Sequence, residues 1–158
     1  MKRFRHGKYC MYQDYCFDLI RKENNRFVLV ARTEYYNESL KKMGFHKYAD
    51  GVYVLEVNSA VIQSAFYVRI WANYDGYSCD LCGVDYENSD DPILYLYAPE
   101  EYQIKTGDHP MHGYDPKFRV KLSALDDIWE ERTPIEGFKF DVEPIVYLKK
   151  DGVWLVEH

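Results

Sequence analysis

Hydrophobic and polar positions alternate with a period of two along most of the chain, as in the strands of a half-buried sheet. The alternation is clearest over residues 66–73, and Asp75 and Gly76 then favour a type I′ turn into a strand over 77–84. The same pattern predicts two more hairpins, joining residues 15–22 to 27–33, and 144–148 to 153–156 through 149–152. Further strands are predicted at 53–57, 93–97, 118–122 and 138–142. The pattern therefore predicts an α+β fold that is predominantly antiparallel β and built from several hairpins.

One or two short helices are expected among these strands. The first would begin near Ser123 and stop at Pro134, with one face formed by side chains at helical spacing: Leu125, Ile128, Trp129 and Arg132. The second would be capped by Asn37 and would end at Gly44, where a missing Cβ tolerates left-handed geometry. It would span one or two turns.

Length and composition are typical of one globular domain over residues 1–158. Hydrophobic residues are 47% of the chain and charged residues 29%, and no repeat or linker marks a boundary. The basic N-terminus is followed by polar residues rather than a signal-like apolar stretch, and the longest apolar-rich run, 57–68, is shorter than the roughly 20 residues of a membrane span. We therefore expect a cytoplasmic protein with reduced thiols and no membrane partner.

Charge is distributed unevenly along the chain. Residues 1–49 carry 11 Lys+Arg and 5 Asp+Glu, residues 50–101 carry 1 and 10, and residues 102–158 carry 8 and 11. The net charge of −6 therefore includes a strongly acidic middle segment. Because a phosphate backbone is bound by cations, this balance argues against a nucleic-acid partner.

The acidic segment is also rich in tyrosine, and aromatic residues make up 17% of the whole chain. Aromatic side chains supply large contact areas, while carboxylates steer a cationic partner and exclude wrong ones. This combination predicts a surface for a positively charged protein, with eight contact residues: Tyr74, Asp75, Tyr77, Asp85, Tyr86, Glu87, Asp90 and Asp91. The alternative is that these residues bind no partner: the tyrosines lie on the faces of strands, and residues 85–91 form a solvated connection.

Two pairs of soft ligands support an alternative interpretation based on a metal. Cys79 and Cys82 form a CxxC pair, His109 and His112 form an HxxH pair, and four such ligands can make a tetrahedral zinc site. A strand over 77–84 would point the two thiols to opposite faces, which disfavours such a site. We expect packed cysteines and no cofactor, with a zinc-dependent enzyme or zinc-stabilised module as the alternative.

No motif in the chain is specific for catalysis. The sequence has no Gly-x-Ser-x-Gly elbow, no phosphate-binding glycine loop and no dinucleotide-binding turn. The acidic residues between 85 and 91 lack the spacing of a calcium-binding EF-hand loop. We therefore expect a protein that is not an enzyme. A carbohydrate- or peptide-binding β-domain is a further alternative, in which Trp71, Tyr74 and Trp154 would form an aromatic platform.

In size, negative charge, interleaving of acidic and aromatic residues over 66–102 and lack of catalytic motifs, the chain resembles the immunity proteins with which bacteria neutralise polymorphic toxins. The resemblance implies a non-enzymatic inhibitor that binds a cognate protein toxin, often a basic nuclease, at or beside its active site. Such a surface would mimic part of a polyanion. The eight contact residues predicted from the pattern would then face the toxin.

Overall fold

The computed structural model describes residues 4–87, 90–107 and 117–156. It is mostly antiparallel β-sheet with two short α-helices, which confirms the predicted α+β class. The chain divides into two compact units, each described here by itself. Unit 1 comprises residues 1–6, 69–131 and 144–158, and unit 2 comprises residues 7–68 and 132–143. No described helix has the length and apolar character needed to cross a membrane.

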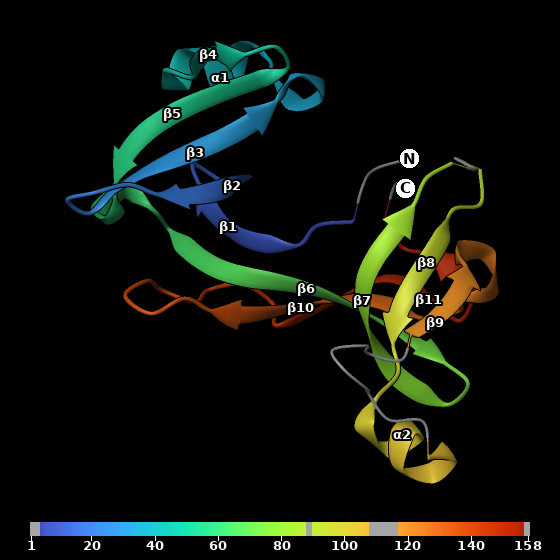
Figure 1. Ribbon diagram of the computed structural model, residues 1–158. Helices are drawn as coiled ribbons and strands as arrows, with labels where there is room; N and C mark the ends of the chain where they lie inside the picture. Colours follow the sequence, from blue (N-terminus) through green and yellow to red (C-terminus); the bar gives the residue numbers. More distant parts are fainter. Residues whose placement is uncertain (1–3, 88–89, 108–116, 157–158) are drawn as a thin grey trace. The chain divides into compact units, whose positions relative to one another are not determined.

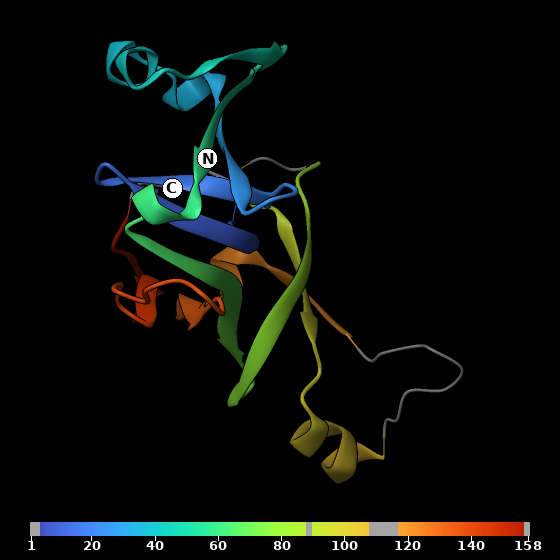
Figure 2. The same ribbon diagram turned by 90° about the vertical axis from the view of Figure 1, so that its left-hand side faces the viewer.

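Unit 2 is an antiparallel sheet with the strand order β6-β1-β2-β3-β5-β4 (Figure 1). Its elements are β1 (Gly7–Tyr12), β2 (Tyr15–Arg21), β3 (Arg26–Arg32), η1 (Thr33–Tyr35), α1 (Glu38–Met43), β4 (His46–Ala49), β5 (Val52–Asn58), η2 (Ser59–Val61) and the first part of β6 (Ser64–Tyr74). Figure 2 shows β3 and β5 running from the sheet toward α1 and β4. Buried side chains such as Phe17, Leu29 and Phe45 form its core.

The predicted helix between Asn37 and Gly44 is confirmed as α1. The Asn37 side chain accepts a hydrogen bond from the Leu40 amide at 3.1 Å, and Gly44 adopts a left-handed φ of 103°. Leu40 is buried, so this face of α1 is attached to the core of unit 2.

Unit 1 contains the rest of β6 and eight further elements: β7 (Tyr77–Asp85), β8 (Ile93–Tyr97), α2 (Glu100–Thr106), β9 (Lys117–Lys121), η3 (Leu122–Ala124), β10 (Ile128–Pro134, which continues into unit 2) and the hairpin of β11 (Ile145–Lys150) with β12 (Val153–Trp154). Strands β6, β7, β8 and β9 pair in that order, and β10 pairs with β11. The predicted turn at Asp75 and Gly76 is confirmed, with φ angles of 51° and 79°.

The predicted helix over residues 123–134 is wrong. Residues 122–124 form one 3-10 turn, and β10 follows with Ile128 opposite Lys149 and Glu130 opposite Val146. Ile128 and Glu130 are buried while Trp129 and Glu131 are not, so burial alternates with the period of a strand. The side chains at helical spacing coincide with this alternation by chance.

The predicted strand over residues 138–142 is also wrong, since this segment pairs with no strand. It is held by Ser64 and Ala65 instead. The Ser64 hydroxyl donates to the Lys139 carbonyl at 3.0 Å and accepts from the Asp141 amide at 3.0 Å, and the Ala65 amide also donates to Lys139. The Ser64 hydroxyl therefore forms hydrogen bonds with backbone groups that would otherwise be available to pair with a neighbouring strand.

The last predicted hairpin is confirmed with a shorter turn. Lys149 and Lys150 pair with Trp154 and Val153, so the connection is Asp151 and Gly152 alone. The predicted hairpin of residues 15–22 and 27–33 is confirmed as β2 and β3, and it turns at Asn24 and Asn25, both with positive φ.

Candidate interaction site

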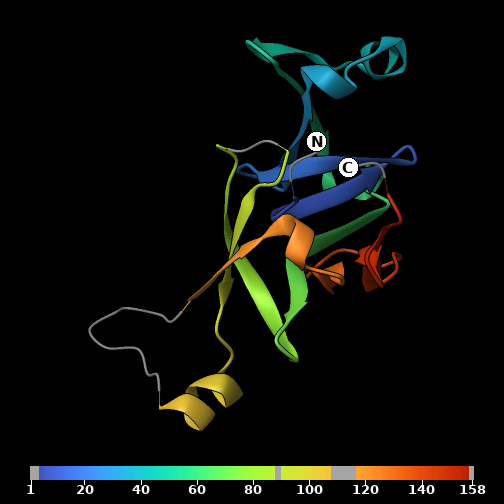
Figure 3. The ribbon, with the colours of Figure 1, turned by 90° about the vertical axis from the view of Figure 1, so that its right-hand side faces the viewer.

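The predicted contact residues lie at or just beyond the two ends of β7, a strand that Figure 3 shows in yellow-green. Tyr74, Asp75 and Tyr77 lie at the β6–β7 turn. The other five predicted residues lie where β7 leads into β8: Asp85, Tyr86, Glu87, Asp90 and Asp91. Because β7 has nine residues, the two groups are separated by about 25 Å at roughly 3.3 Å per residue. The eight side chains therefore form two separate groups.

At the turn, the tyrosines belong to an aromatic cluster formed by Tyr74, Tyr77, Tyr102 and Phe118. Tyr74 packs on Phe118 with ring centroids 4.9 Å apart, Tyr77 on Tyr102 at 5.6 Å, and Tyr102 on Phe118 at 4.8 Å. Tilted and edge-to-face aromatic contacts of this kind stabilise a fold beyond the area they bury. The cluster attaches α2 and β9 to the hairpin, so two predicted anchors have internal partners, while Asp75 is exposed.

At the other end, residues 85–91 form an acidic connection whose two ends are hydrogen-bonded. Asp85 Oδ1 accepts from the Glu87 amide at 2.9 Å. Asp91 accepts from the Ser123 amide at 2.9 Å and from its hydroxyl at 2.7 Å, and these bonds lower the pKa of Asp91. Glu87 and Asp90 are exposed. Asp85 and Asp91 therefore hold the connection, while Glu87 and Asp90 face solvent.

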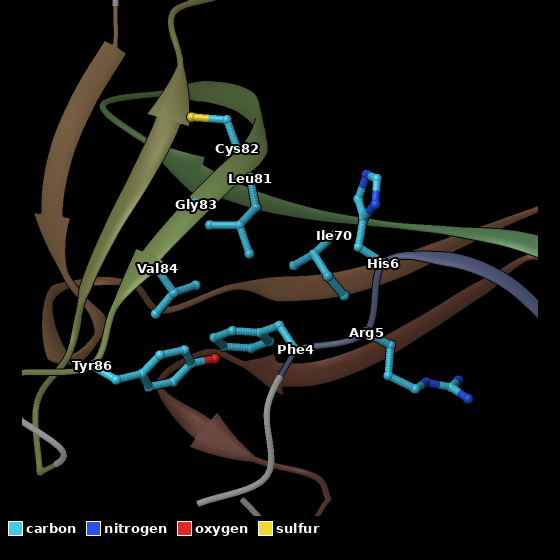
Figure 4. A pocket seen from close by; sticks show the side chains of 9 residues that line it. All are labelled: Phe4, Arg5, His6, Ile70, Leu81, Cys82, Gly83, Val84 and Tyr86. Atoms are coloured by element: carbon cyan, nitrogen blue, oxygen red, sulfur yellow. The ribbon is translucent and has the colours of Figure 1, made fainter. Parts of the chain in front are cut away.

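Tyr86 lines a cavity of about 250 Å³ within unit 1 (Figure 4). The Phe4 ring lies in the cavity beside Val84 and Tyr86, while the Arg5 and His6 side chains point away. The remaining lining is mostly apolar and comes from Ile70 and residues 81–84. Phe4 and its surroundings supply packing, without convergent polar groups that would bind a substrate.

An ion pair anchors the segment that carries Phe4. Arg5 donates to both carboxylate oxygens of Glu130, at 2.9 and 2.7 Å, and the Glu130 side chain is only 5% exposed. A second ion pair joins Arg69 on β6 to Asp80 on β7. The sequence prediction contained neither pair, and for Arg5 nothing in a linear pattern indicates a partner 125 positions away.

The two thiols of the CxxC pair have separate surroundings. Cys79 is buried and donates to the Tyr77 carbonyl, whereas Cys82 is half-buried and donates to the Tyr95 carbonyl at 3.1 Å. Burial raises the pKa of Cys79 to about 11 and also raises the pKa of Cys82, which disfavours the thiolates that a metal needs. His109 and His112 lie outside the described residues. Within residues 4–87, 90–107 and 117–156, no three His, Cys, Asp or Glu side chains cluster as metal ligands.

The three rings of the proposed aromatic platform contact three different neighbours. The Arg69 guanidinium lies 5.2 Å from the Trp71 ring, and Lys149 Nζ lies 5.4 Å from the Trp154 ring. Tyr74 belongs to the aromatic cluster. Each ring therefore has its own intramolecular partner.

Helix α2 is a further feature absent from the sequence prediction. Its signals were present: Glu100 and Glu101 in the first turn, Lys105 in the last, and Gly107 as the left-handed cap. The helix has no buried residue, so the apolar stripe that normally identifies a helix is missing.

The charge of the protein divides between the units. Unit 1 contains 10 Lys+Arg and 16 Asp+Glu, whereas unit 2 contains 10 of each. The whole net charge of −6 therefore belongs to unit 1, which also carries all eight predicted contact residues.

The comparisons with known proteins identify one family. No curated protein and no solved structure matches the chain. The family model described as Uncharacterised conserved protein UCP033725 matches residues 4–109, which include all eight predicted contact residues. Because this match covers more than half of the chain, the protein belongs to that uncharacterised family.

Proposed function

We propose that the protein is a non-enzymatic inhibitor that binds a cationic protein, as an immunity protein binds its cognate toxin. The observation that carries this proposal is the location of the entire net charge on unit 1. An acidic unit attracts a cationic partner over a distance set by salt screening, and it raises the association rate more than the affinity. Binding takes place in the cytoplasm without a cofactor.

The acidic connection of residues 85–91 is the part of unit 1 best suited to this role. Hydrogen bonds hold the Asp85 and Asp91 carboxylates at its ends, so these two side chains are already oriented before a partner binds. Glu87 and Asp90 present their carboxylates to solvent between these points. The group at the turn contributes Asp75, since its tyrosines are engaged in the aromatic cluster.

The test compares two variants with the same change in charge. Glu87→Lys with Asp90→Lys alters unit 1, and Glu34→Lys with Glu136→Lys alters exposed positions of unit 2. The tagged wild-type protein is used to capture partners from native lysate, and each captured protein is produced separately. We expect the unit 1 variant to associate about tenfold more slowly at low salt, a difference that disappears at high salt.

The unit 2 variant is the matched control, and it should associate like the wild type. Thermal unfolding of each variant establishes that both remain folded. Equal association rates for the two variants would contradict the proposed surface. A captured partner that keeps its full activity, or its toxicity in cells, while bound would contradict the inhibitor itself.

A further inference from the structure

Strand β9 lies at an edge of the sheet in unit 1. It pairs with β8 through five residue pairs, from Ile93 opposite Lys121 to Tyr97 opposite Lys117. Among the described residues, β8 is its only strand partner, and no other backbone hydrogen bond reaches residues 117–121. An edge of this kind offers a row of backbone donors and acceptors to another strand.

The exposed side chains of β9 are all cationic. Lys117, Arg119 and Lys121 occupy alternate positions and are exposed, while Val120 between them is buried. Alternate residues share a face of a sheet, so the three cations form one row spaced by about 6.6 Å. We name residues Lys117, Arg119 and Lys121 the cationic row.

Each member of the cationic row lies opposite an apolar residue on β8. Lys121 faces Ile93, Arg119 faces Tyr95, and Lys117 faces Tyr97, whose ring centroid is 5.6 Å from Lys117 Nζ. Carboxylates are therefore absent from the directly opposite positions on β8. The charge of Lys121 interacts with the Asp91 carboxylate, which lies just before β8, and the other edge of β9 has no strand partner among the described residues.

The charges decide which strand fits that edge. Pairing β9 with β9 of a second copy would place cations opposite cations, which is unfavourable. A segment with carboxylates at every second residue would place one carboxylate opposite each cation, with side chains about 5 Å apart. We propose that β9 binds an extended acidic segment of another protein, which adds to the sheet as a strand.

A nucleic acid would also offer negative charge to the cationic row, and Tyr95 and Tyr97 could stack on bases. Two observations favour a peptide. The backbone groups of an edge strand are complemented by another peptide backbone, which a nucleic acid lacks. The net charge of −6 on unit 1 also repels a polyphosphate more than a short peptide.

The test is an NMR titration in which a synthetic peptide of alternating Glu and Thr is added to the full chain labelled with ¹⁵N. We expect the peptide to shift the amide signals of residues 117–121, and we expect a Lys–Thr peptide of equal length to leave them unchanged. Lys117→Glu with Arg119→Glu should weaken binding of the acidic peptide about tenfold and allow the Lys–Thr peptide to bind. Lys41→Glu with Lys150→Glu, which changes exposed cations elsewhere, should bind like the wild type.

Several outcomes would overturn the proposal. One is the absence of shifts at β9 up to the solubility limit of the acidic peptide. Another is an equal response to both peptides, which would indicate that charge does not select the strand. A third is a response to oligo-dT alone, centred on Tyr95 and Tyr97, which would indicate a single-stranded nucleic acid as the ligand of this face.

Discussion

Asp91 was predicted to contact a partner, but its side chain is hydrogen-bonded within the protein, to Ser123. Both of its carboxylate oxygens accept hydrogen bonds from Ser123, which join the acidic connection to the turn before β10. These bonds favour the charged carboxylate and lower its pKa below the ordinary value of 3.8. Asp91 is therefore a residue that holds the acidic connection rather than one that is free to bind a partner.

This assignment predicts a pH-dependent contribution to stability. A carboxylate whose pKa is lowered by folding stabilises the protein above its ordinary pKa and loses that effect as pH falls through the lower, folded value. We expect Asp91→Asn to be less stable than the wild type near neutral pH and the two free energies of unfolding to converge as pH falls through the lowered pKa of folded Asp91. Urea unfolding across this range measures the difference.

The control for this prediction is Ser123→Ala, which removes the hydroxyl donor and keeps the carboxylate. In that background, the pH dependence of the Asp91→Asn difference should be smaller. A difference that stays constant from neutral to acidic pH would contradict the assignment of the effect to ionised Asp91.

The identity of the candidate residues could be predicted from composition, but their roles could not. Interleaved Asp, Glu and Tyr residues identified the β6–β7 turn and the connection of residues 85–91, which lie at the two ends of β7. Whether Tyr74 faces solvent or packs on Phe118 depends on β9, which is distant in sequence. The same holds for Asp91 and Ser123, which are 32 positions apart.

At the scale of elements, an ion pair helps to hold the segment that carries Phe4. Arg5 binds Glu130 on β10 through both carboxylate oxygens, and Glu130 is nearly inaccessible to water. A buried carboxylate that loses a cationic partner is unfavourable, because its charge is then less well compensated in surroundings that exclude water. The position of Phe4 in the cavity therefore depends on this pair.

We expect Arg5→Met to destabilise the protein by about 2–3 kcal/mol, somewhat below the usual range because Arg5 is partly exposed. Replacing both partners, Arg5→Met with Glu130→Met, removes the uncompensated charge and should recover most of this loss. Chemical denaturation of the two variants measures both free energies. Equal destabilisation by the single and double variants would show that the ion pair contributes little.

Secondary structure was predictable where local and tertiary preferences agree. The hairpins turning at Asn24, Asp75 and Asp151 have turn residues that match their strands, and α1 has both caps. The prediction fails where apolar residues fit both the helical period and the alternation of a strand, as between Leu125 and Arg132. There, pairing with β11 favours the strand β10. The prediction also fails for residues 138–142, because the Ser64 hydroxyl replaces a neighbouring strand.

At the scale of the whole molecule, charge is divided by unit rather than by sequence segment. The basic residues 1–49 belong mostly to unit 2, where acidic residues balance them, and unit 1 keeps the excess of carboxylates. Excess charge of one sign destabilises a compact unit through repulsion among its own residues. The proposed partner would relieve this repulsion, so the surface that attracts the partner is also a source of instability in its absence.

This argument predicts how salt affects the free protein. Added salt screens the repulsion in unit 1 over about 10 Å, so the unfolding temperature should rise with salt at low ionic strength. Glu87→Lys with Asp90→Lys removes part of the repulsion and should flatten that rise, whereas Glu34→Lys with Glu136→Lys gives the neutral unit 2 a net charge of +4 and should not flatten it. Thermal unfolding of the three proteins over a salt series distinguishes these cases without a partner. If both variants flatten the rise equally, only the total charge matters, and the division between the units no longer supports a partner-binding surface on unit 1.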